Sequence, residues 1–328
     1  MSTRRRADKV KHDSRIYVAG HRGLVGSAIV RRLESAGYGN LVVRTHAELD
    51  LIDQDATTAF FQAERPEYVF LAASKVGGIG ANTTYPAQFI YENLAVATNV
   101  IEAAYRSGVA KLLNLGSSCI YPRLSPQPIP EEALLTGPLE PTNEPYAIAK
   151  IAAIKMCSAY NQQYGTNFIS LMPTNLYGPG DTYDLENGHV LPVLIAKFHA
   201  AKESGEDLVV LWGDGSPKRE FLFVDDLADA CVTMMERFDA SEMGEFVNVG
   251  SAEELSIAEL ADLVRAAVYA DARERTCEIV WDATKPNGMP RKLIDSTRMR
   301  ALGWKPKTPL AEGIPIAYAD FLERHGGR

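Results

Sequence analysis

Cysteine is scarce in this sequence, and the few cysteines are scattered. The 328 residues include four, none in a Cys-x-x-Cys pair, so the pattern indicates neither a zinc site nor a disulfide framework and suits a reducing compartment. No apolar run approaches the roughly 20 residues of a membrane-spanning helix. Residues 1–14 are basic and lack an apolar segment, which argues against a secretory signal and predicts a flexible tail. These absences predict a cytoplasmic protein with no metal and no membrane partner.

An excess of positive charge is also missing. The formal net charge is −8 at pH 7, which argues against nucleic acid or an anionic membrane as the main partner. A chain of this length is long enough for one large α/β domain and a smaller one. These bulk properties fit a soluble enzyme.

A glycine-rich turn lies close to the start of the chain. Residues 15–19 form a short apolar run that ends at the turn, and residues 24–37 follow with helical periodicity. A dinucleotide pyrophosphate binds at such a strand–turn–helix junction, against backbone N–H groups at the start of the helix. The turn has the spacing G-x-x-G-x-x-G, and we expect cofactor contacts from Gly20, His21, Arg22, Gly23, Leu24, Val25 and Gly26.

The end of the predicted second strand, 41–45, bears on the choice of cofactor. Folds that prefer NAD usually place an acid there, about 20 residues after the glycine turn, to hold the ribose 2′-hydroxyl. This sequence has Arg44 at that position and Arg22 inside the turn. Two guanidiniums suit a 2′-phosphate, so we predict NADPH. In the alternative interpretation, Arg44 ends the strand and faces solvent.

The first half of the chain alternates strands and helices, which predicts a Rossmann-type, doubly wound parallel sheet. We expect an NADP-binding domain over 15–180 and a smaller α/β substrate-binding lobe over 181–328, with 219–250 returning to the first domain. The further predicted strands are 68–73, 111–118, 168–172 and 208–212, and the further predicted helices are 89–107, 146–164 and 191–202.

Three polar residues point to chemistry at a carbonyl group. Tyr146 and Lys150 are four residues apart and share a helix face, and Ser117 precedes them at the end of a predicted strand. A free tyrosine titrates near pH 10, and a nearby ammonium lowers that pKa and can hold the cofactor ribose. Ser117 can donate to the carbonyl oxygen, where negative charge develops. In the alternative interpretation, Tyr146 is an ordinary amphipathic tyrosine and Lys150 a solvated charge.

Longer runs of the sequence resemble the extended short-chain dehydrogenase/reductase superfamily and, within it, the GDP-L-fucose synthase family. The resemblance extends from Arg15 to the predicted C-terminal helix. The runs that carry it are AGHRGLVGSAI (19–29), KVGGIGANTTYPAQFI (75–90), LGSSCIYP (115–122), LEPTNEPYAIAKIA (139–152), MPTNLYGPGD (172–181), PKREFLFVDDLA (217–228) and KPNGMPRKLID (285–295).

The resemblance implies an enzyme that uses NADPH to convert GDP-4-keto-6-deoxy-D-mannose to GDP-L-fucose. The reaction is an epimerisation at carbons 3 and 5, followed by reduction at carbon 4. The match places the reductive triad on Ser117, Tyr146 and Lys150, and the epimerisation acid and base on Cys119 and His189. Without the resemblance, Cys119 reads as a small buried hydrophobe and His189 as an exposed loop residue or a helix cap.

The resemblance also implies substrate and cofactor contacts. Trp212 could instead be core packing, and Lys292 with Arg291 could be a solvated basic pair. His46 stands where the family has arginine, which leaves the 2′-phosphate more to Arg44 and Arg22. Lys197 also replaces an arginine, which keeps the charge but loses the bidentate geometry toward phosphate. The implied substrate contacts are Lys197, Trp212, Arg219 and Lys292. The further cofactor contacts are Leu115, Gly116, Ser117, Ser118, Lys150, Pro173, Thr174, Asn175, Leu176 and His189.

Family relatives dimerise through the helix that bears the tyrosine, so we expect a homodimer, although the apolar face of this helix could equally pack inside the monomer. Two kinds of enzyme remain as alternatives. One is a nucleotide-sugar 4-epimerase or 4,6-dehydratase that retains NAD, and the other is a related GDP-keto-sugar reductase. A simple epimerase would not need Cys119 and His189, and a dehydratase would place an acidic pair where Cys119 and Ile120 stand. A non-catalytic dinucleotide sensor is the third alternative.

Overall fold

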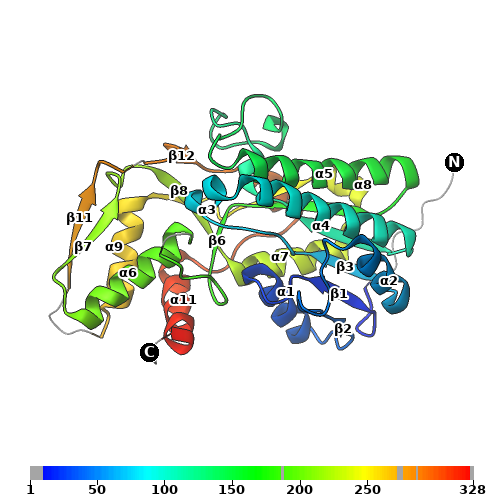
Figure 1. Cartoon of the computed structure of the whole chain (residues 1–328), viewed down its shortest axis with the longest axis horizontal. Helices are drawn as coiled ribbons and strands as arrows, with labels where there is room; N and C mark the ends of the chain where they lie inside the picture. Colours follow the sequence, from blue (N-terminus) through cyan, green and yellow to red (C-terminus); the bar gives the residue numbers. More distant parts are fainter. Residues whose placement is uncertain (1–9, 186–187, 272–275, 286, 326–328) are drawn as a thin grey trace.

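The computed structural model describes residues 10–185, 188–271, 276–285 and 287–325, so the predicted basic tail lies outside the described residues as far as residue 9. The larger of its sheets has six parallel strands in the order β2-β1-β3-β4-β5-β9 (Figure 1). This order confirms the predicted Rossmann-type sheet. The strands are β1 (Ile16–Ala19), β2 (Leu41–Val42), β3 (Tyr68–Leu71), β4 (Lys111–Leu115), β5 (Phe168–Pro173) and β9 (Val247–Val249).

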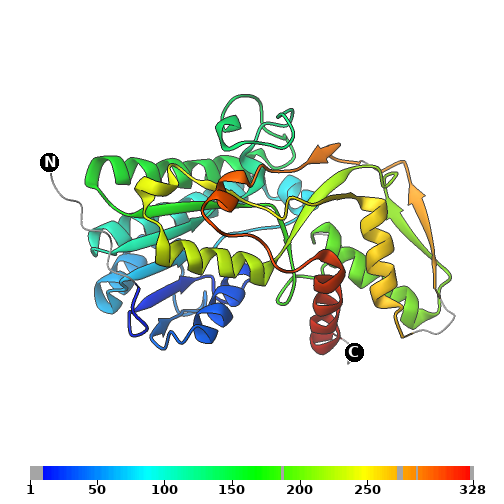
Figure 2. The same ribbon diagram turned by 180° about the vertical axis from the view of Figure 1, so that it is seen from behind.

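Helices cover both faces of this sheet, as Figures 1 and 2 show from opposite sides. Side chains alternate along a strand, so Ile16 and Val18 of β1 join one hydrophobic cluster, whereas Tyr17 and Ala19 join another. Strands buried on both faces are apolar throughout, which explains the continuous apolar runs in the sequence. One face carries α1 (Leu24–Ser35) and α7 (Val224–Arg237), and the other carries α2 (Gln54–Glu64), α4 (Pro86–Arg106) and α5 (Glu144–Tyr164).

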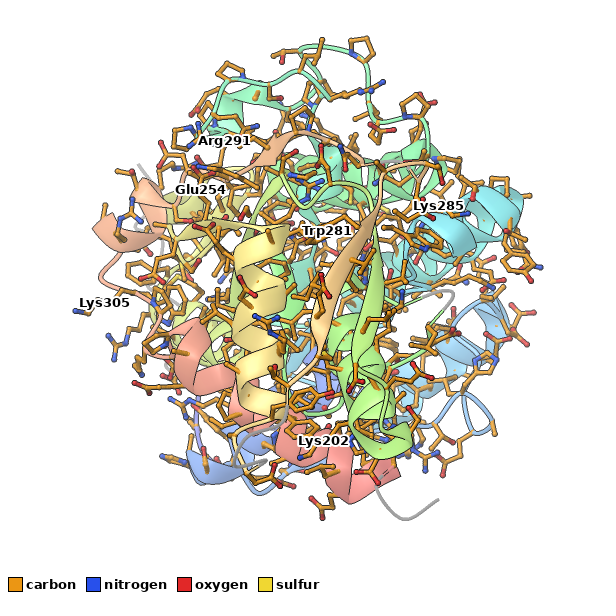
Figure 3. All side chains as sticks on the ribbon, turned by 90° about the vertical axis from the view of Figure 1, so that its left-hand side faces the viewer. Lys202, Glu254, Trp281, Lys285, Arg291 and Lys305 are labelled. Carbon is orange, nitrogen blue, oxygen red and sulfur yellow. The ribbon has the colours of Figure 1, made fainter. Side chains whose placement is uncertain are left out.

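A smaller layer of strands and helices adjoins the carboxyl ends of the large sheet. It has a four-stranded sheet of β6, β8, β10 and β12 and a two-stranded ribbon of β7 and β11. Arg291 donates twice to the Glu254 carboxylate at 2.7 Å, which joins the outer strands of the four-stranded sheet (Figure 3). The strands are β6 (Asn175–Tyr177), β7 (Leu208–Trp212), β8 (Lys218–Phe223), β10 (Glu254–Ser256), β11 (Glu278–Asp282) and β12 (Arg291–Lys292).

Three helices supply the core of the smaller layer: α6 (Val190–Ser204), α9 (Ile257–Val268) and α11 (Leu310–His325). Their apolar side chains pack with the inward-facing residues of β7 and β8 in one buried cluster. In the described part of the chain, no helix is both long and apolar enough to span a bilayer. The short helices are α3 (Ile79–Thr84), α8 (Ala240–Met243), α10 (Thr297–Ala301), η1 (Ser118–Ile120) and η2 (Glu131–Ala133).

Two segments differ in detail from what the sequence predicts. The predicted return of 219–250 to the first domain applies to α7 and β9, whereas β8 belongs to the smaller sheet. The predicted second strand is shorter, because β2 is an edge strand that ends at Val42. Arg44 therefore lies beyond the strand, where it forms an ion pair with Glu64 of α2.

The fully buried Glu220 joins the two sheets. One of its carboxylate oxygens accepts from the N–H of Ala252 at 2.7 Å, and the other accepts from the N–H of Ile294 at 3.2 Å. Its backbone carbonyl accepts from the hydroxyl of Thr174 and the amide of Asn175. Glu220 thus connects β8 to the end of β5, to the loop after β9 and to the residues after β12.

We predict that Glu220→Gln destabilises the fold. A glutamine amide presents only one oxygen, so one buried N–H would face another donor and lose its acceptor. This change costs about 1–3 kcal/mol of the free energy of unfolding. Urea denaturation followed by circular dichroism measures the loss, and Glu253→Gln, at an exposed position nearby, is the matched control. Equal unfolding midpoints for the two variants would contradict this role.

Candidate active site

The glycine-rich turn brings three backbone segments into close contact. Gly20 has φ +82°, and a Cβ there would lie 2.7 Å from Ala73 Cα, after the end of β3. A Cβ on Gly26 would lie 2.1 Å from the Gly20 carbonyl oxygen, so glycine lets α1 approach the turn. The N-cap of α1 is Gly23, and no side chain caps this helix. An uncapped helix N-terminus against a glycine turn fits a dinucleotide pyrophosphate.

A pocket of about 300 Å³ lies beside this turn, between the ends of β1 and β3 and the loop after β2. Gly20, Arg44, His46 and Lys75 are among the residues that line it. Arg44 packs over the ring of Phe60 with its guanidinium carbon 5.5 Å from the ring centre. The predicted cofactor, with its pyrophosphate at the glycine turn, would place its adenosine in this pocket.

Two guanidiniums act on Glu48, in the loop after β2. The pKa of Glu48 is lowered mainly by the N–H and hydroxyl of Thr45, and further by the charges of Arg44 and Arg22. Both arginines therefore act on the same region, although Arg22 is exposed. His46, which stands where the family has an arginine, is also exposed.

The predicted triad lies where β4 ends and α5 begins. Lys150 is buried, and its ammonium donates to the carbonyl of Leu115 at 2.9 Å. This ammonium lies 5.8 Å from the centre of the Tyr146 ring. The side chains of Ser117 and Ser74 lie close enough to the Tyr146 hydroxyl to lower its pKa, although burial has the larger and opposite effect. The sequence reasoning missed Ser74, which immediately precedes the matching run 75–90.

Burial dominates the ionisation of both catalytic candidates. It lowers the pKa of Lys150 to about 8 and raises the pKa of Tyr146. The sequence predicts that Lys150 lowers the pKa of Tyr146. The structure shows the opposite net shift, because the phenol is desolvated and the ammonium is directed to Leu115. The phenol is thus held in its protonated form.

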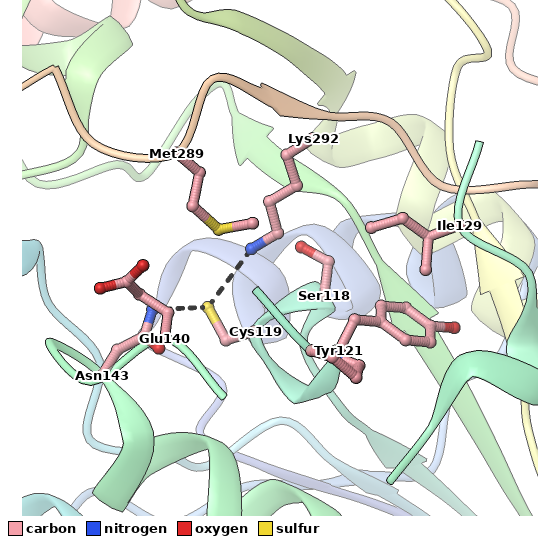
Figure 4. A pocket seen from close by; sticks show the side chains of 9 residues that line it. Ser118, Cys119, Tyr121, Ile129, Glu140, Asn143, Met289 and Lys292 are labelled. Carbon is pink, nitrogen blue, oxygen red and sulfur yellow. Dashed lines mark hydrogen bonds between the residues drawn. The ribbon is translucent and has the colours of Figure 1, made fainter. Parts of the chain in front are cut away.

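Cys119 lies between two hydrogen-bond donors in a narrow pocket (Figure 4). The amide of Asn143 is 3.4 Å from its sulfur, and the ammonium of Lys292 is 3.6 Å from it. Asn143 was missed by the sequence reasoning, although it lies three residues before Tyr146. Two donors directed at one sulfur stabilise negative charge on it.

His189 is the N-cap residue of α6 and is exposed. Even so, the surrounding protein desolvates the imidazole ring, and this lowers the pKa of His189. The nearby charge of Lys292 lowers that pKa further. The imidazole is therefore neutral at neutral pH and able to accept a proton. Lys292 links the two predicted epimerisation residues, because it contacts the Cys119 sulfur and acts on His189.

The cations predicted to bind substrate lie in the smaller layer. Arg219 of β8 and Lys292 of β12 are register partners on neighbouring strands. Burial lowers the pKa of Arg219, whose guanidinium donates to the carbonyl of Lys218. The side chain of Lys197 on α6 donates to the carbonyl of Val210 at 2.9 Å.

Trp212, at the end of β7, is 61% exposed, so it is not a core residue. The ammonium of Lys285 lies 5.6 Å from the centre of its ring. An exposed indole beside a cation is suited to stacking on an aromatic ligand.

The remaining predicted cofactor contacts lie at the carboxyl ends of the central strands. Leu115 ends β4, and Gly116, Ser117 and Ser118 follow it. Pro173 ends β5, Thr174 is buried after it, and Asn175 and Leu176 begin β6. In the described ranges, no cluster of three or more His, Cys, Asp and Glu side chains is placed to hold a metal ion.

Comparisons with known proteins agree with this geometry. A sequence model of the NAD dependent epimerase/dehydratase family matches residues 16–250. GDP-L-fucose synthase 1 of Arabidopsis thaliana is 58% identical over 310 residues, which cover 94% of each chain. The crystal structure of a GDP-6-OMe-4-keto-L-xylo-heptose reductase from C. jejuni superposes with a TM-score of 0.91 at 35% identity, covering 97% of this chain and all of the other.

A GDP-L-fucose synthetase from Naegleria fowleri, solved bound to NADP, has a TM-score of 0.87 at 29% identity and covers 98% of this chain and 97% of its own. The similar fold and the high identity over nearly the whole chain make the relationship clear. The chain therefore belongs to the NAD dependent epimerase/dehydratase family and, within it, to the GDP-L-fucose synthases.

Proposed function

We propose that this protein converts GDP-4-keto-6-deoxy-D-mannose to GDP-L-fucose with NADPH, by epimerisation at carbons 3 and 5 and then reduction at carbon 4. The observation that carries the proposal is that two sets of reactive groups share one site. Cys119 lies close enough to Tyr146 to raise the pKa of the phenol beyond the effect of burial, and Lys292 links Cys119 to His189. The family relationship names the substrate.

In the reduction, bound NADPH supplies the hydride to carbon 4 of the sugar. The hydroxyls of Ser117 and Tyr146 donate to the ketone oxygen, where negative charge develops. Tyr146 then gives its proton to that oxygen, and burial keeps the phenol protonated until it is needed. Lys150 fixes the first turns of α5 against the end of β4 through its hydrogen bond to the Leu115 carbonyl.

In the epimerisation, the ketone acidifies the hydrogens at carbons 3 and 5. A base on one face of the ring removes a proton, and the enolate oxygen that forms is stabilised by the same Ser117 and Tyr146 hydroxyls. An acid on the opposite face returns a proton to the carbon. Cys119 and His189 are the two groups available for these steps, since one is a thiol held between two donors and the other is a neutral imidazole.

The GDP part of the substrate fits the smaller layer. Arg219 presents a partly desolvated guanidinium to a diphosphate, and Lys292 adds charge beside it. Lys197 of α6 would be a further contact of the substrate. The exposed ring of Trp212 offers a stacking surface for guanine. The large sheet then holds the cofactor, so the sugar lies between the two layers.

Assembly and location complete the proposal. The helices α4 and α5 pack along each other and expose Tyr91, Ile148 and Tyr164, which supports a homodimer formed through these helices. All four cysteines are free thiols, which supports residence in a reducing compartment such as the cytoplasm.

The first prediction from this proposal concerns turnover. Purified protein given GDP-4-keto-6-deoxy-D-mannose should oxidise NADPH, with NADH slower, and mass spectrometry and NMR should identify the product as GDP-L-fucose. A reduced sugar with unchanged carbons 3 and 5 would favour a GDP-keto-sugar reductase of the kind found in C. jejuni. No oxidation of either cofactor would contradict the proposal.

The second prediction concerns the 2′-phosphate. Arg44→Ala should weaken NADPH binding by about 10- to 100-fold, which is the loss expected for one charge-assisted hydrogen bond. NADH binding should stay nearly unchanged, because NADH lacks that phosphate. Fluorescence titration measures both affinities, with Arg65→Ala, at an exposed position after α2, as the matched control. An equal loss for both cofactors would show that Arg44 does not read the phosphate.

The third prediction separates the two half-reactions. Cys119→Ser and His189→Asn should each slow the exchange of sugar hydrogens with D₂O by about 10²–10⁴-fold, the usual contribution of a general acid or base. Reduction of the unepimerised ketone should continue, giving a 6-deoxy sugar with unchanged carbons 3 and 5. Cys277→Ser, in the smaller layer, is the matched cysteine control. Full exchange in both variants would assign the epimerisation to other groups.

A further inference from the structure

The N-cap residue of α5 does not cap the helix with its side chain. This residue is Asn143, and its side chain makes no hydrogen bond to the first turn of α5. Asparagine is among the best N-cap residues, because its side-chain oxygen usually accepts from a backbone N–H of that turn. Here the amide nitrogen donates instead to the Cys119 sulfur at 3.4 Å. The start of α5 thus gives up its usual cap, and the side chain contacts Cys119.

The amide of Asn143 has no second partner that accounts for its position. Its oxygen is buried and has no hydrogen-bond partner in the described part of the chain. The backbone of Asn143 is engaged separately, since its N–H donates to the carbonyl of Glu140 and its carbonyl accepts from the N–H of Ala147. An unpaired buried acceptor costs stability, so the contact with the sulfur is what this side chain contributes.

A second donor at the sulfur determines where the thiol hydrogen points. The Lys292 ammonium, 3.6 Å from the sulfur, can only donate, and the nitrogen of Asn143 also donates (Figure 4). With two donors bound to it, the sulfur in its protonated form directs its own hydrogen away from both. Lys292 is also a proposed substrate contact, so its charge is shared with a diphosphate, whereas the amide of Asn143 serves Cys119 alone.

We propose that Asn143 is a positioning residue that holds the Cys119 sulfur for proton exchange with the sugar and stabilises it as a thiolate. The inference rests on the proposed function, because it assigns Asn143 a part in the epimerisation. When Cys119 acts as the acid, its S–H bond breaks and a C–H bond forms at the sugar carbon, while the enolate electrons restore the ketone. When Cys119 acts as the base, the same bonds change in reverse. A thiolate stands on one side of the step in either direction, so the donor from Asn143 assists both roles.

Several ionisable groups around Cys119 bear on any measurement of its proton exchange. The side chain of Asn143 is uncharged, and no described hydrogen bond joins it to any of them, so its replacement by alanine leaves their own contacts in place. The effect of that replacement therefore reports the amide itself. The ionisable groups are Lys292 of β12, His189 at the start of α6, Tyr146 of α5, and Glu140 with its ion-pair partner Arg123.

The test uses Asn143→Ala and Asn143→Asp in the full chain. With NADP+ present so that no reduction occurs, NMR follows the exchange of the hydrogens at carbons 3 and 5 of GDP-4-keto-6-deoxy-D-mannose with D₂O. We expect Asn143→Ala to slow this exchange by about 10- to 100-fold, the loss expected for one hydrogen bond to a charged group. Oxidation of GDP-L-fucose by NADP+, the reverse of the reduction, needs no epimerisation and should change by less than about threefold.

Asn143→Asp separates a contact with the sulfur from a structural effect on the helix. Aspartate caps a helix as well as asparagine does, so the melting temperature should not fall. Its carboxylate cannot donate to the sulfur and repels a thiolate, so the exchange should slow at least as much as in Asn143→Ala. Glu144→Gln, at the exposed next position, is the matched control and should leave both reactions at their native rates.

A second readout needs no substrate and so is independent of the proposed reaction. Cys119 is partly exposed, whereas the other cysteines are buried, so iodoacetamide should alkylate Cys119 first, and peptide mass spectrometry identifies the modified residue. Iodoacetamide reacts with the thiolate, so the pH at which alkylation accelerates follows the ionisation of the thiol. In both Asn143 variants this pH should be higher than in the native chain, and highest in Asn143→Asp. In Glu144→Gln it should not change.

Three outcomes would overturn the inference. One is native exchange in both Asn143 variants. Another is an Asn143→Asp protein whose exchange returns to the native rate while Asn143→Ala is slow, since that would make Asn143 only a helix cap. The third is an alkylation profile that stays in place or moves to lower pH, which would mean that the amide does not donate to the sulfur. If the native chain neither exchanges nor reduces a GDP-keto-sugar, the proposed function fails, and the alkylation profile still decides the role of Asn143.

Discussion

The hydrogen bond from the Lys150 ammonium to the Leu115 carbonyl is the contact on which the site depends. It attaches the first turns of α5 to the end of β4 inside the protein, where Lys150 is buried. With this attachment, Tyr146 faces Ser117, and both lie at the edge where parallel strands end together. The same burial lowers the pKa of Lys150 and raises that of Tyr146. Burial therefore affects the protonation of these two groups as well as their positions.

The smaller layer completes the site by bringing cations to it. Lys292, far along the chain, reaches the Cys119 sulfur because β12 pairs with β8, and β8 is anchored to the large sheet by Glu220. This acidic protein thereby places positive charge beside the site proposed for the diphosphate. In the proposed function, this arrangement would let the reductive and epimerising groups act on one bound sugar without its release.

Much of this arrangement was predictable from local sequence. The apolar runs gave the central strands, because strands buried on both faces are apolar at every position. The glycine spacing gave the close approach of α1 to the first turn, and the four-residue spacing of Tyr146 and Lys150 gave their common face. Cys119 and His189 came from resemblance alone, since an isolated thiol or imidazole has no local pattern that marks it as reactive.

Other features were decided only in three dimensions. Ser74 and Asn143 were not predicted as site residues, and their places beside Tyr146 and Cys119 follow from the packing of α4 and α5 on the sheet. The net shift of the Tyr146 pKa was predicted with the wrong sign, because the sequence shows the neighbouring lysine but not the desolvation that outweighs it. The sequence by itself determined the order of the elements and the residue types at the strand ends. The tertiary structure alone decided hydrogen-bond direction and ionisation, because both depend on burial and on partners distant in the chain.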